Sequence, residues 1–213
     1  FIQIRVRTSP ISFPLHRYRE RDVETQVTCD GCGLEFAIFG VFAGCPDCGE
    51  LNAWVVFEKS LTVATKRLQL AESLGPDDPE MREALLRDTL VSACAAFDGL
   101  GKALRERNPQ LFPAKPPNLF QNVEALSQVL QGALGRNLAD LIGADRAEFL
   151  RKMLQVRHLC EHNMGVVDAK FVARVPALAH LRGRKYPLQQ GEVENLLSVL
   201  KDTAAGIRGA VGT

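Results

Sequence analysis

Two Cys-x-x-Cys motifs near the N-terminus constrain this chain more than any other feature of its sequence. Cys29 and Cys32 form the first motif, twelve residues follow, and Cys45 and Cys48 form the second. Two residues between cysteines allow one tight turn to aim both sulfur atoms at a single ion. Four thiolates give a closed tetrahedral site, which predicts one structural Zn²⁺ whose binding supplies folding free energy that so small a piece cannot obtain from a core.

The residues around these motifs predict short strands. Gly33 and Gly49 follow the second cysteine of each motif and permit the positive φ angle that such a turn usually needs. Apolar residues between the motifs suit strands, as do residues 1–7, which alternate apolar and polar side chains, and residues 54–57. We therefore predict a small β zinc ribbon over residues 1–58. Ribbons bind nucleic acid, recruit a protein partner or brace a neighbouring domain, and the sequence does not choose among these roles.

From Lys59 onward the apolar residues follow a helical period. They recur three and four positions apart from Leu61 to Leu74 and form one apolar stripe. Asp78 and Asp168 are predicted as N-caps of later helices. Those helices are expected at residues 79–107, 120–134, 137–142, 144–164, 168–175 and 190–207. The sequence thus predicts a mainly α fold, an antiparallel helical bundle over residues 59–213 that follows the ribbon.

Composition and charge narrow the class of protein. Hydrophobic residues make up 46% of the chain and charged residues 24%, as in globular proteins, and no apolar run approaches the roughly 20 residues of a membrane span. Six cysteines, four of them in the two motifs, suit a metal site in the reducing cytoplasm better than a disulfide framework. Cys94 lies among apolar residues and is expected in the core.

Two basic segments stand out in a chain whose net charge is only +1. Residues 1–19 and residues 169–191 contain no acidic side chain, whereas each holds several arginines or lysines. These segments predict a phosphate-binding surface, with RNA as the expected partner. The alternative is that carboxylates from elsewhere in the chain neutralise them.

The most chemically suggestive stretch is residues 157–163, late in the helix predicted at 144–164. One interpretation is structural, with a histidine at a helix end and an arginine at an interface. A second is metal-free RNA cleavage, in which His162 activates the 2′-hydroxyl and the Arg157 guanidinium stabilises the charge that develops on phosphorus. The two residues lie about 140° apart around the helix and about 7.5 Å apart along it, so they would flank a groove without touching.

A third interpretation is a metallopeptidase. Residues 158–162 match the H-x-x-E-H pattern, with His158 and His162 on one helix face at a suitable spacing for zinc. Such a site needs a further acidic ligand, for which Glu192, Glu194 and Asp168 are the candidates. A five-residue pattern often occurs by chance, and this interpretation ranks last.

Residues 155–171 resemble the hallmark helix of HEPN domains, which carry an R-x4-6-H motif. The resemblance implies an all-α bundle, usually a homodimer, and a metal-independent endoribonuclease or an inactive relative that binds RNA or nucleotides, in a prokaryotic toxin or phage-defence setting. Carried over by position, Arg157 and His162 are the catalytic pair, with His158 and Asn163 in support. The ribbon is an addition to the HEPN core.

RNA cleavage or RNA binding is therefore the leading hypothesis. The rival is a non-catalytic interaction or scaffold module, in which the same helix forms a dimer interface and the ribbon recruits a protein partner. A nuclease predicts that the basic segments line the groove beside Arg157 and His162. A scaffold predicts that the polar residues of this helix are buried against one another, and a peptidase predicts a second zinc site.

Overall fold

The protein is mainly helical, with a small two-stranded antiparallel sheet on its N-terminal side, as the sequence predicted. The structure is a computed structural model that describes residues 24–39, 44–74 and 78–211. Its elements are β1 (Glu24–Thr28), β2 (Glu35–Phe39), α1 (Ala53–Ser73), α2 (Pro79–Arg107), η2 (Leu119–Gln121), α3 (Val123–Leu134), α4 (Leu138–Ile142), α5 (Ala144–His162), α6 (Ala169–Arg174), η3 (Pro176–Leu181) and α7 (Gln190–Val211).

The N-terminal ribbon, residues 24–39 and 44–51, contains both strands. β1 and β2 pair antiparallel, with Glu24 opposite Phe39 and Thr28 opposite Glu35. An isolated β-bridge pairs Gly44 with Leu51, one on each side of the second cysteine motif. The strand predicted at residues 1–7 lies outside the described residues.

The strand predicted at residues 54–57 is wrong, because this segment forms the first turn of α1. Trp54 and Phe57 are buried and continue with Leu61 in the same stripe of residues spaced three and four apart. This stripe packs along α2, so helical burial outweighs the β propensity of a short aromatic and β-branched run. The boundary predicted at residue 58 consequently lies inside α1.

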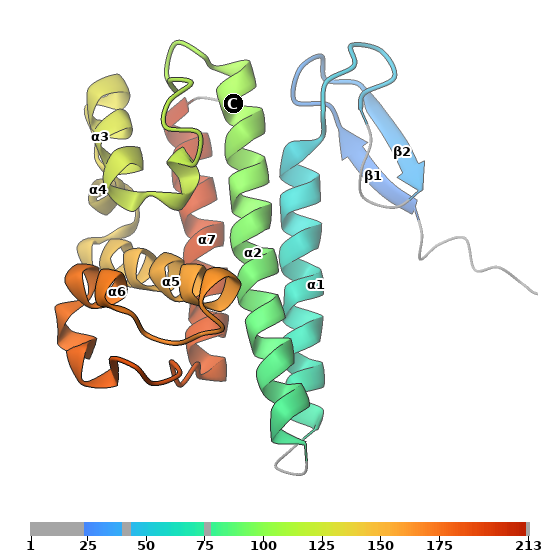
Figure 1. Ribbon diagram of the computed structural model, residues 1–213. Coiled ribbons are helices and arrows are strands. Elements are labelled where there is room, and N and C mark those ends of the chain that lie inside the picture. Colours follow the sequence, from blue (N-terminus) through green and yellow to red (C-terminus); the bar gives the residue numbers. More distant parts are fainter. Residues whose placement is uncertain (1–23, 40–43, 75–77, 212–213) are drawn as a thin grey trace, which may run out of the picture.

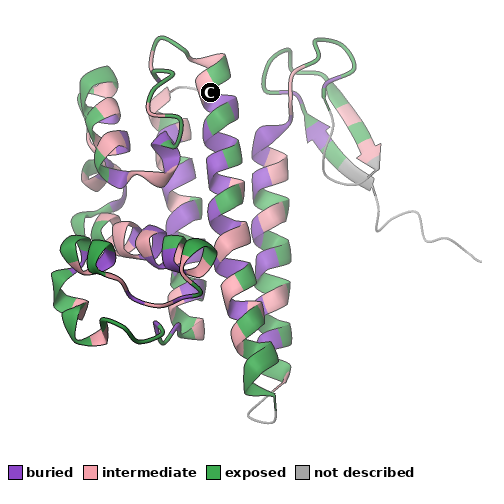
Figure 2. Cartoon of the chain, in the orientation of Figure 1, coloured by how far each residue is buried: buried purple, intermediate pink, exposed green. Residues whose placement is uncertain are grey.

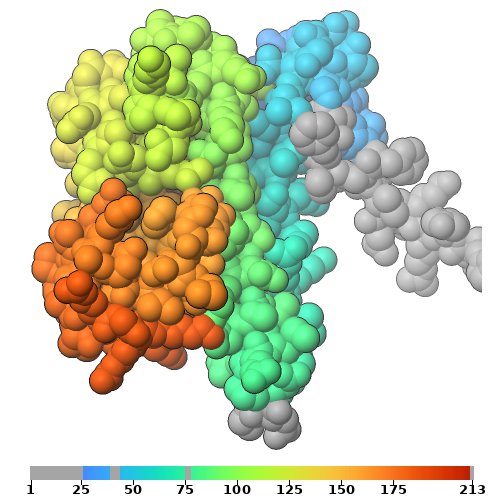
Figure 3. All heavy atoms as spheres, viewed as in Figure 1, coloured from blue at the N-terminus to red at the C-terminus, as the bar shows by residue number. Residues whose placement is uncertain are grey.

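Figure 1 shows three long helices, α1, α2 and α7, standing side by side, with α5 lying crosswise in front of α7 and reaching α2. α2 contacts α1, α7, α5 and η2, and its buried residues run from Leu86 to Leu104 (Figure 2). Cys94, expected in the core, is 1% exposed on α2. In the space-filling view, the α5–η3 region packs directly against α2 (Figure 3). One hydrophobic core therefore joins all the long helices.

Local capping explains where the helices that carry the site begin and end. The side chain of Asp168 accepts from the Phe171 main-chain N–H at 2.7 Å, as predicted for an N-cap. α5 ends at His162, two residues earlier than predicted, because Met164 has a φ of 52° and Gly165 a φ of 80°. The Gly165 N–H then bonds back to the Leu159 carbonyl at 2.9 Å, which closes the helix.

η2 is held against α2 by a glycine. A Cβ atom on Gly101 would lie 2.1 Å from the Phe120 ring carbon Cγ, so only glycine lets this ring pack there. The helix predicted from residue 120 instead begins at Val123, because the Asn122 side chain caps it through the Ala125 N–H. The close approach of Phe120 to α2 fixes the position of the neighbouring Gln121, which contacts the site described below.

We predict that Gly101→Ala destabilises the protein by about 1–3 kcal/mol, because the added methyl group overpacks against Phe120. Gly99→Ala on the same helix is the matched control, since a Cβ atom there meets no neighbour within 4 Å. That control should stabilise the protein by about 0.5–1 kcal/mol through helix propensity. Urea unfolding of both variants measures the difference, and equal effects would contradict the packing role assigned to Gly101.

Candidate functional site

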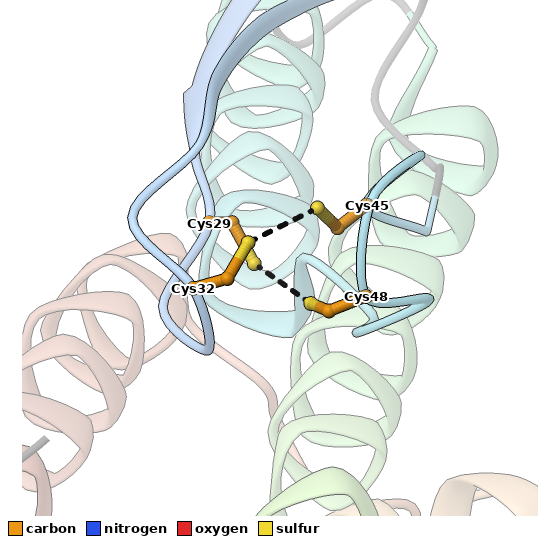
Figure 4. Close-up of side chains that lie close together, drawn as sticks. All are labelled: Cys29, Cys32, Cys45 and Cys48. Atoms are coloured by element: carbon orange, nitrogen blue, oxygen red, sulfur yellow. Dashed lines mark hydrogen bonds between the residues drawn. The ribbon is translucent and has the colours of Figure 1, made fainter.

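The four motif cysteines lie together at the tip of the ribbon (Figure 4). The Sγ atoms of Cys29 and Cys48 are 3.5 Å apart, and those of Cys32 and Cys45 are 3.6 Å apart. All four sulfur atoms lie within 4.8 Å of one another, so they can hold a metal ion. The sequence prediction that these cysteines form one cluster is confirmed.

The two cysteine turns have the same construction. In each turn the glycine after the second cysteine donates its N–H to the first cysteine's carbonyl, from Gly33 to Cys29 at 2.9 Å and from Gly49 to Cys45 at 2.8 Å. Both glycines have a positive φ, 77° and 75°, as predicted. Hydrogen bonding from the main chain at Cys32 lowers the pKa of the Cys29 thiol to about 7. Burial and the neighbouring thiols instead raise the pKa of Cys32 to about 12, so Cys29 is the thiol that most readily becomes a thiolate.

Two arginines attach this cluster to the helical bundle. Arg107, at the end of α2, pairs with Glu50 and approaches Asp30 at 3.7 Å. Arg208, near the end of α7, pairs with Asp30 at 3.0 Å and lies over the Trp54 ring at 4.9 Å. Because Asp30 stands between two of the cysteines, the first cysteine turn is tied to the ends of two long helices and the start of a third.

Arg157 is turned inward from α5. Its Nη1 donates to Gln121 Oε1 at 2.9 Å, and its Nη2 pairs with Glu161 Oε2 at 2.9 Å. The side chain is 15% exposed, and its buried Nε makes no hydrogen bond within the described part of the chain. Gln121 comes from η2, a partner that sequence periodicity did not reveal.

His162 is 61% exposed, and its Nε2 lies 3.5 Å from Glu161 Oε2. This is the same carboxylate oxygen that Arg157 contacts, so Glu161 joins the two residues predicted as the catalytic pair. The helical spacing predicts only that Arg157 and His162 flank a groove, with no such role for Glu161. A residue four positions from Arg157 and next to His162 is the signal that could have shown it.

The two supporting residues have different surroundings. The His158 ring lies 4.8 Å from the His162 ring, centroid to centroid, at an angle of 57°. Burial lowers the pKa of His158, and the neighbouring His162 lowers it further. Asn163 donates its side-chain N–H to the Val166 carbonyl, so in this structure it closes the end of α5.

A pocket of about 300 Å³ lies beside Arg157 and His158, between η2, α5 and α6. Its lining includes Lys170 and Arg174 from the second basic segment, and His162 lies outside it. Lys185, from the same segment, instead pairs with Glu83 on α2 at 2.8 Å. The second basic segment is therefore split between the pocket and an ion pair, and the first, residues 1–19, lies outside the described residues.

The geometry gives the peptidase interpretation no third ligand. Within residues 24–39, 44–74 and 78–211, the four cysteines make up the one group of three or more histidine, cysteine or acidic side chains positioned to hold a metal. Glu192, a candidate ligand, accepts from Lys152 at 2.8 Å and from the Tyr186 hydroxyl at 2.7 Å.

Cys94 lies in the core, apart from the four clustered cysteines. Burial raises the pKa of its thiol to about 12, so it stays protonated.

No family model, curated protein or solved structure matches this chain. Among the described helices, none is long and apolar enough to cross a membrane. The functions proposed below for the cysteine cluster and for the pocket beside Arg157 are therefore argued from the geometry of these two sites.

We predict that Arg107→Gln destabilises the protein by about 1–2 kcal/mol, between the values of exposed and buried ion pairs, because Arg107 is 16% exposed and contacts both Asp30 and Glu50. It should also speed the loss of metal to a chelator. Lys66→Gln, at an exposed position on α1, is the control for the lost charge. Thermal unfolding and chelation rates measure both effects. Metal loss at the wild-type rate would show that Arg107 does not brace the cluster.

Proposed function

We propose that the cysteine cluster holds one structural Zn²⁺ per chain. A tetrahedral site with Zn–S bonds of about 2.3 Å places its sulfur atoms about 3.8 Å apart. The cluster comes close to this, with sulfur pairs at 3.5 Å and 3.6 Å and all four within 4.8 Å. Four cysteine ligands leave no open position for a substrate, so the ion would brace the fold and would not perform chemistry.

We predict that the purified protein contains one zinc ion per chain and that Cys45→Ser lowers both its metal content and its melting temperature. Cys45 is 3% exposed and lies within the cluster. Cys160→Ser is the control, because Cys160 is on α5 and outside the cluster. Elemental analysis with thermal unfolding tests this, and iron or no bound metal would contradict it.

We propose that the α5 site acts on RNA, as a metal-independent endoribonuclease or an RNA-binding protein of the HEPN type. The observation that carries this proposal is the meeting of Arg157 and His162 at one Glu161 oxygen, beside a pocket lined by Lys170 and Arg174. A guanidinium and an imidazole are the groups that metal-free RNA cleavage requires, and nearby cations attract the phosphate backbone.

In this proposal each group has one task. His162 is exposed, with its Nε2 beside Glu161, so its other ring nitrogen is the one that accepts the proton of the 2′-hydroxyl. Arg157 uses one N–H of each terminal nitrogen on Gln121 and Glu161, and its Nε is buried, which leaves the second N–H of each terminal nitrogen for the phosphate oxygens. His158, in the pocket, supports the phosphate. Asn163 supports the site indirectly, by fixing the helix end next to His162.

The wider setting belongs to the same proposal. The resemblance of residues 155–171 to HEPN domains implies a homodimer in prokaryotic toxin or phage defence, and we include this setting in the proposal. Reduced cysteines at the metal site fit the cytoplasm. The ribbon, attached through Arg107 and Arg208, is then a rigid element that can present a surface to a protein partner.

One observation favours the alternative, a non-catalytic interaction or scaffold module. Arg157 contacts Gln121 and Glu161 in a partly buried network, and the scaffold hypothesis predicted such contacts between buried polar residues. In that case Arg157 holds η2 against α5, and removing it would affect stability more than any activity.

The decisive test is RNA cleavage by the purified protein in EDTA, at a dose that leaves the ribbon folded. We expect 2′,3′-cyclic phosphate ends from wild type and a rate at least about 100-fold lower for Arg157→Ala and for His162→Ala, as expected when a general base or a phosphate contact is lost. His180→Ala, an exposed histidine in η3, should cleave as wild type does.

Two other results would redirect the interpretation. If wild type and both variants fold but none cleaves RNA, the scaffold hypothesis replaces the nuclease. If Arg157→Ala melts at a much lower temperature while His162→Ala keeps full activity, Arg157 is a structural residue.

A further inference from the structure

The pocket beside Arg157 has an apolar floor. Leu154, Leu159 and Phe171 line it and are at most 4% exposed, so α5 and α6 supply a fixed surface. With a volume of about 300 Å³, the pocket is at the small end of the range found for ligand sites. Because these side chains are so nearly covered, they offer a ligand a small apolar patch, which can contact part of a nucleobase.

Polar groups converge above this floor. The amide side chains of Asn118, Gln121 and Gln155 line the pocket. The oxygen atoms of the two glutamines accept from Arg157 at 2.9 Å and from Arg174 at 2.6 Å. Their NH₂ groups are thereby oriented and can donate to the edge of a base.

Cations dominate the charge of the pocket. Lys170 and Arg174, both on α6 and both exposed, line it together with Arg157. The one acidic side chain in the lining is Asp168, whose Oδ1 accepts from the Phe171 N–H at 2.7 Å as the helix cap. Arg157 is already paired with Glu161, so Lys170 and Arg174 supply the positive charge against one engaged carboxylate, which makes this pocket a site for an anion.

We propose that this pocket binds one unstacked nucleoside monophosphate unit, with the phosphate on Lys170 and Arg174 and the base between the amides on the apolar floor. None of these groups belongs to the Arg157–His162 pair, and His162 lies outside the pocket. The proposal rests on the proposed function for the ligand being RNA, but it requires no cleavage. A duplex cannot fill the pocket unless it gives up the stacking of one base.

Two sources supply this chemistry, a single-stranded RNA and a free nucleotide. A strand would add contacts outside the pocket, next to Arg157 and His162, and would therefore bind more tightly than a nucleotide. The experiment below includes both ligands so that the source is identified.

The test measures binding to the His162→Ala chain, so that no RNA is cut. The probes are a short fluorescein-labelled single-stranded RNA, the same strand annealed to its complement, and the four nucleoside monophosphates as competitors. We expect Lys170→Gln with Arg174→Gln to weaken single-strand binding at least about tenfold, a loss of about 1.4 kcal/mol. Lys201→Gln with Lys66→Gln, exposed on α7 and α1, is the charge-matched control and should change it less than about twofold.

The pattern of results decides the proposal. Weaker single-strand binding by the α6 variant supports the proposal. If the nucleoside monophosphates also compete less well with the α6 variant than with the parent chain, the pocket is sufficient to bind a free nucleotide. Equal losses in the α6 variant and the control, or equal affinity for duplex and single strand, would overturn it. RNA cleavage by a chain with His162 intact is measured separately, so this inference can fail while the nuclease stands, and the reverse also holds.

Discussion

The burial of α2 is the constraint on which the rest of this structure depends. This helix packs against α1, α7, α5 and η2, and residues such as Leu90 and Phe97 are at most 1% exposed. A 29-residue helix gains little stability from its own propensity compared with what such packing contributes. The surrounding helices are arranged around it because each must bury its own apolar stripe, and α2 offers several faces at once.

Both candidate sites are positioned by this helix. Arg107, in its last turn, contacts the ribbon that carries the cysteine cluster, and Gly101, six residues earlier, admits the Phe120 ring. The Phe120 contact fixes η2, which places Gln121 on Arg157. A rigid central element therefore holds the cysteine cluster at its end and one wall of the pocket along its side. This arrangement gives both sites a fixed geometry without long loops.

Glu161 is the residue that links structural and functional interpretations of α5. Its carboxylate lies 2.9 Å from Arg157 and 3.5 Å from His162, with its side chain 24% exposed. Such a contact is strong enough to hold a guanidinium in place, yet it leaves other donors of that guanidinium free. A partly buried arginine that is already oriented loses less entropy when it binds phosphate than a mobile one. The same network thus holds η2 against α5 and also suits a site that binds phosphate.

The sequence by itself determined the parts set by local spacing. The two Cys-x-x-Cys motifs fixed the four-cysteine cluster and its glycine turns, because two intervening residues allow few other geometries. Helical periodicity and capping residues such as Asp168 gave most helices to within a few residues. Residues 54–57 were misassigned because a run of four apolar residues fits a strand or a buried helix equally well.

Only the tertiary structure decided which partners meet. Gln121 lies 36 positions from Arg157 in the sequence, and no local pattern predicts their contact. The attachment of the ribbon through Arg107 and Arg208, and the pocket that Lys170 and Arg174 line, depend in the same way on helix packing. Spacing along a chain fixes what one turn or one helix face can hold, whereas contacts between distant segments are fixed by the burial of the whole core.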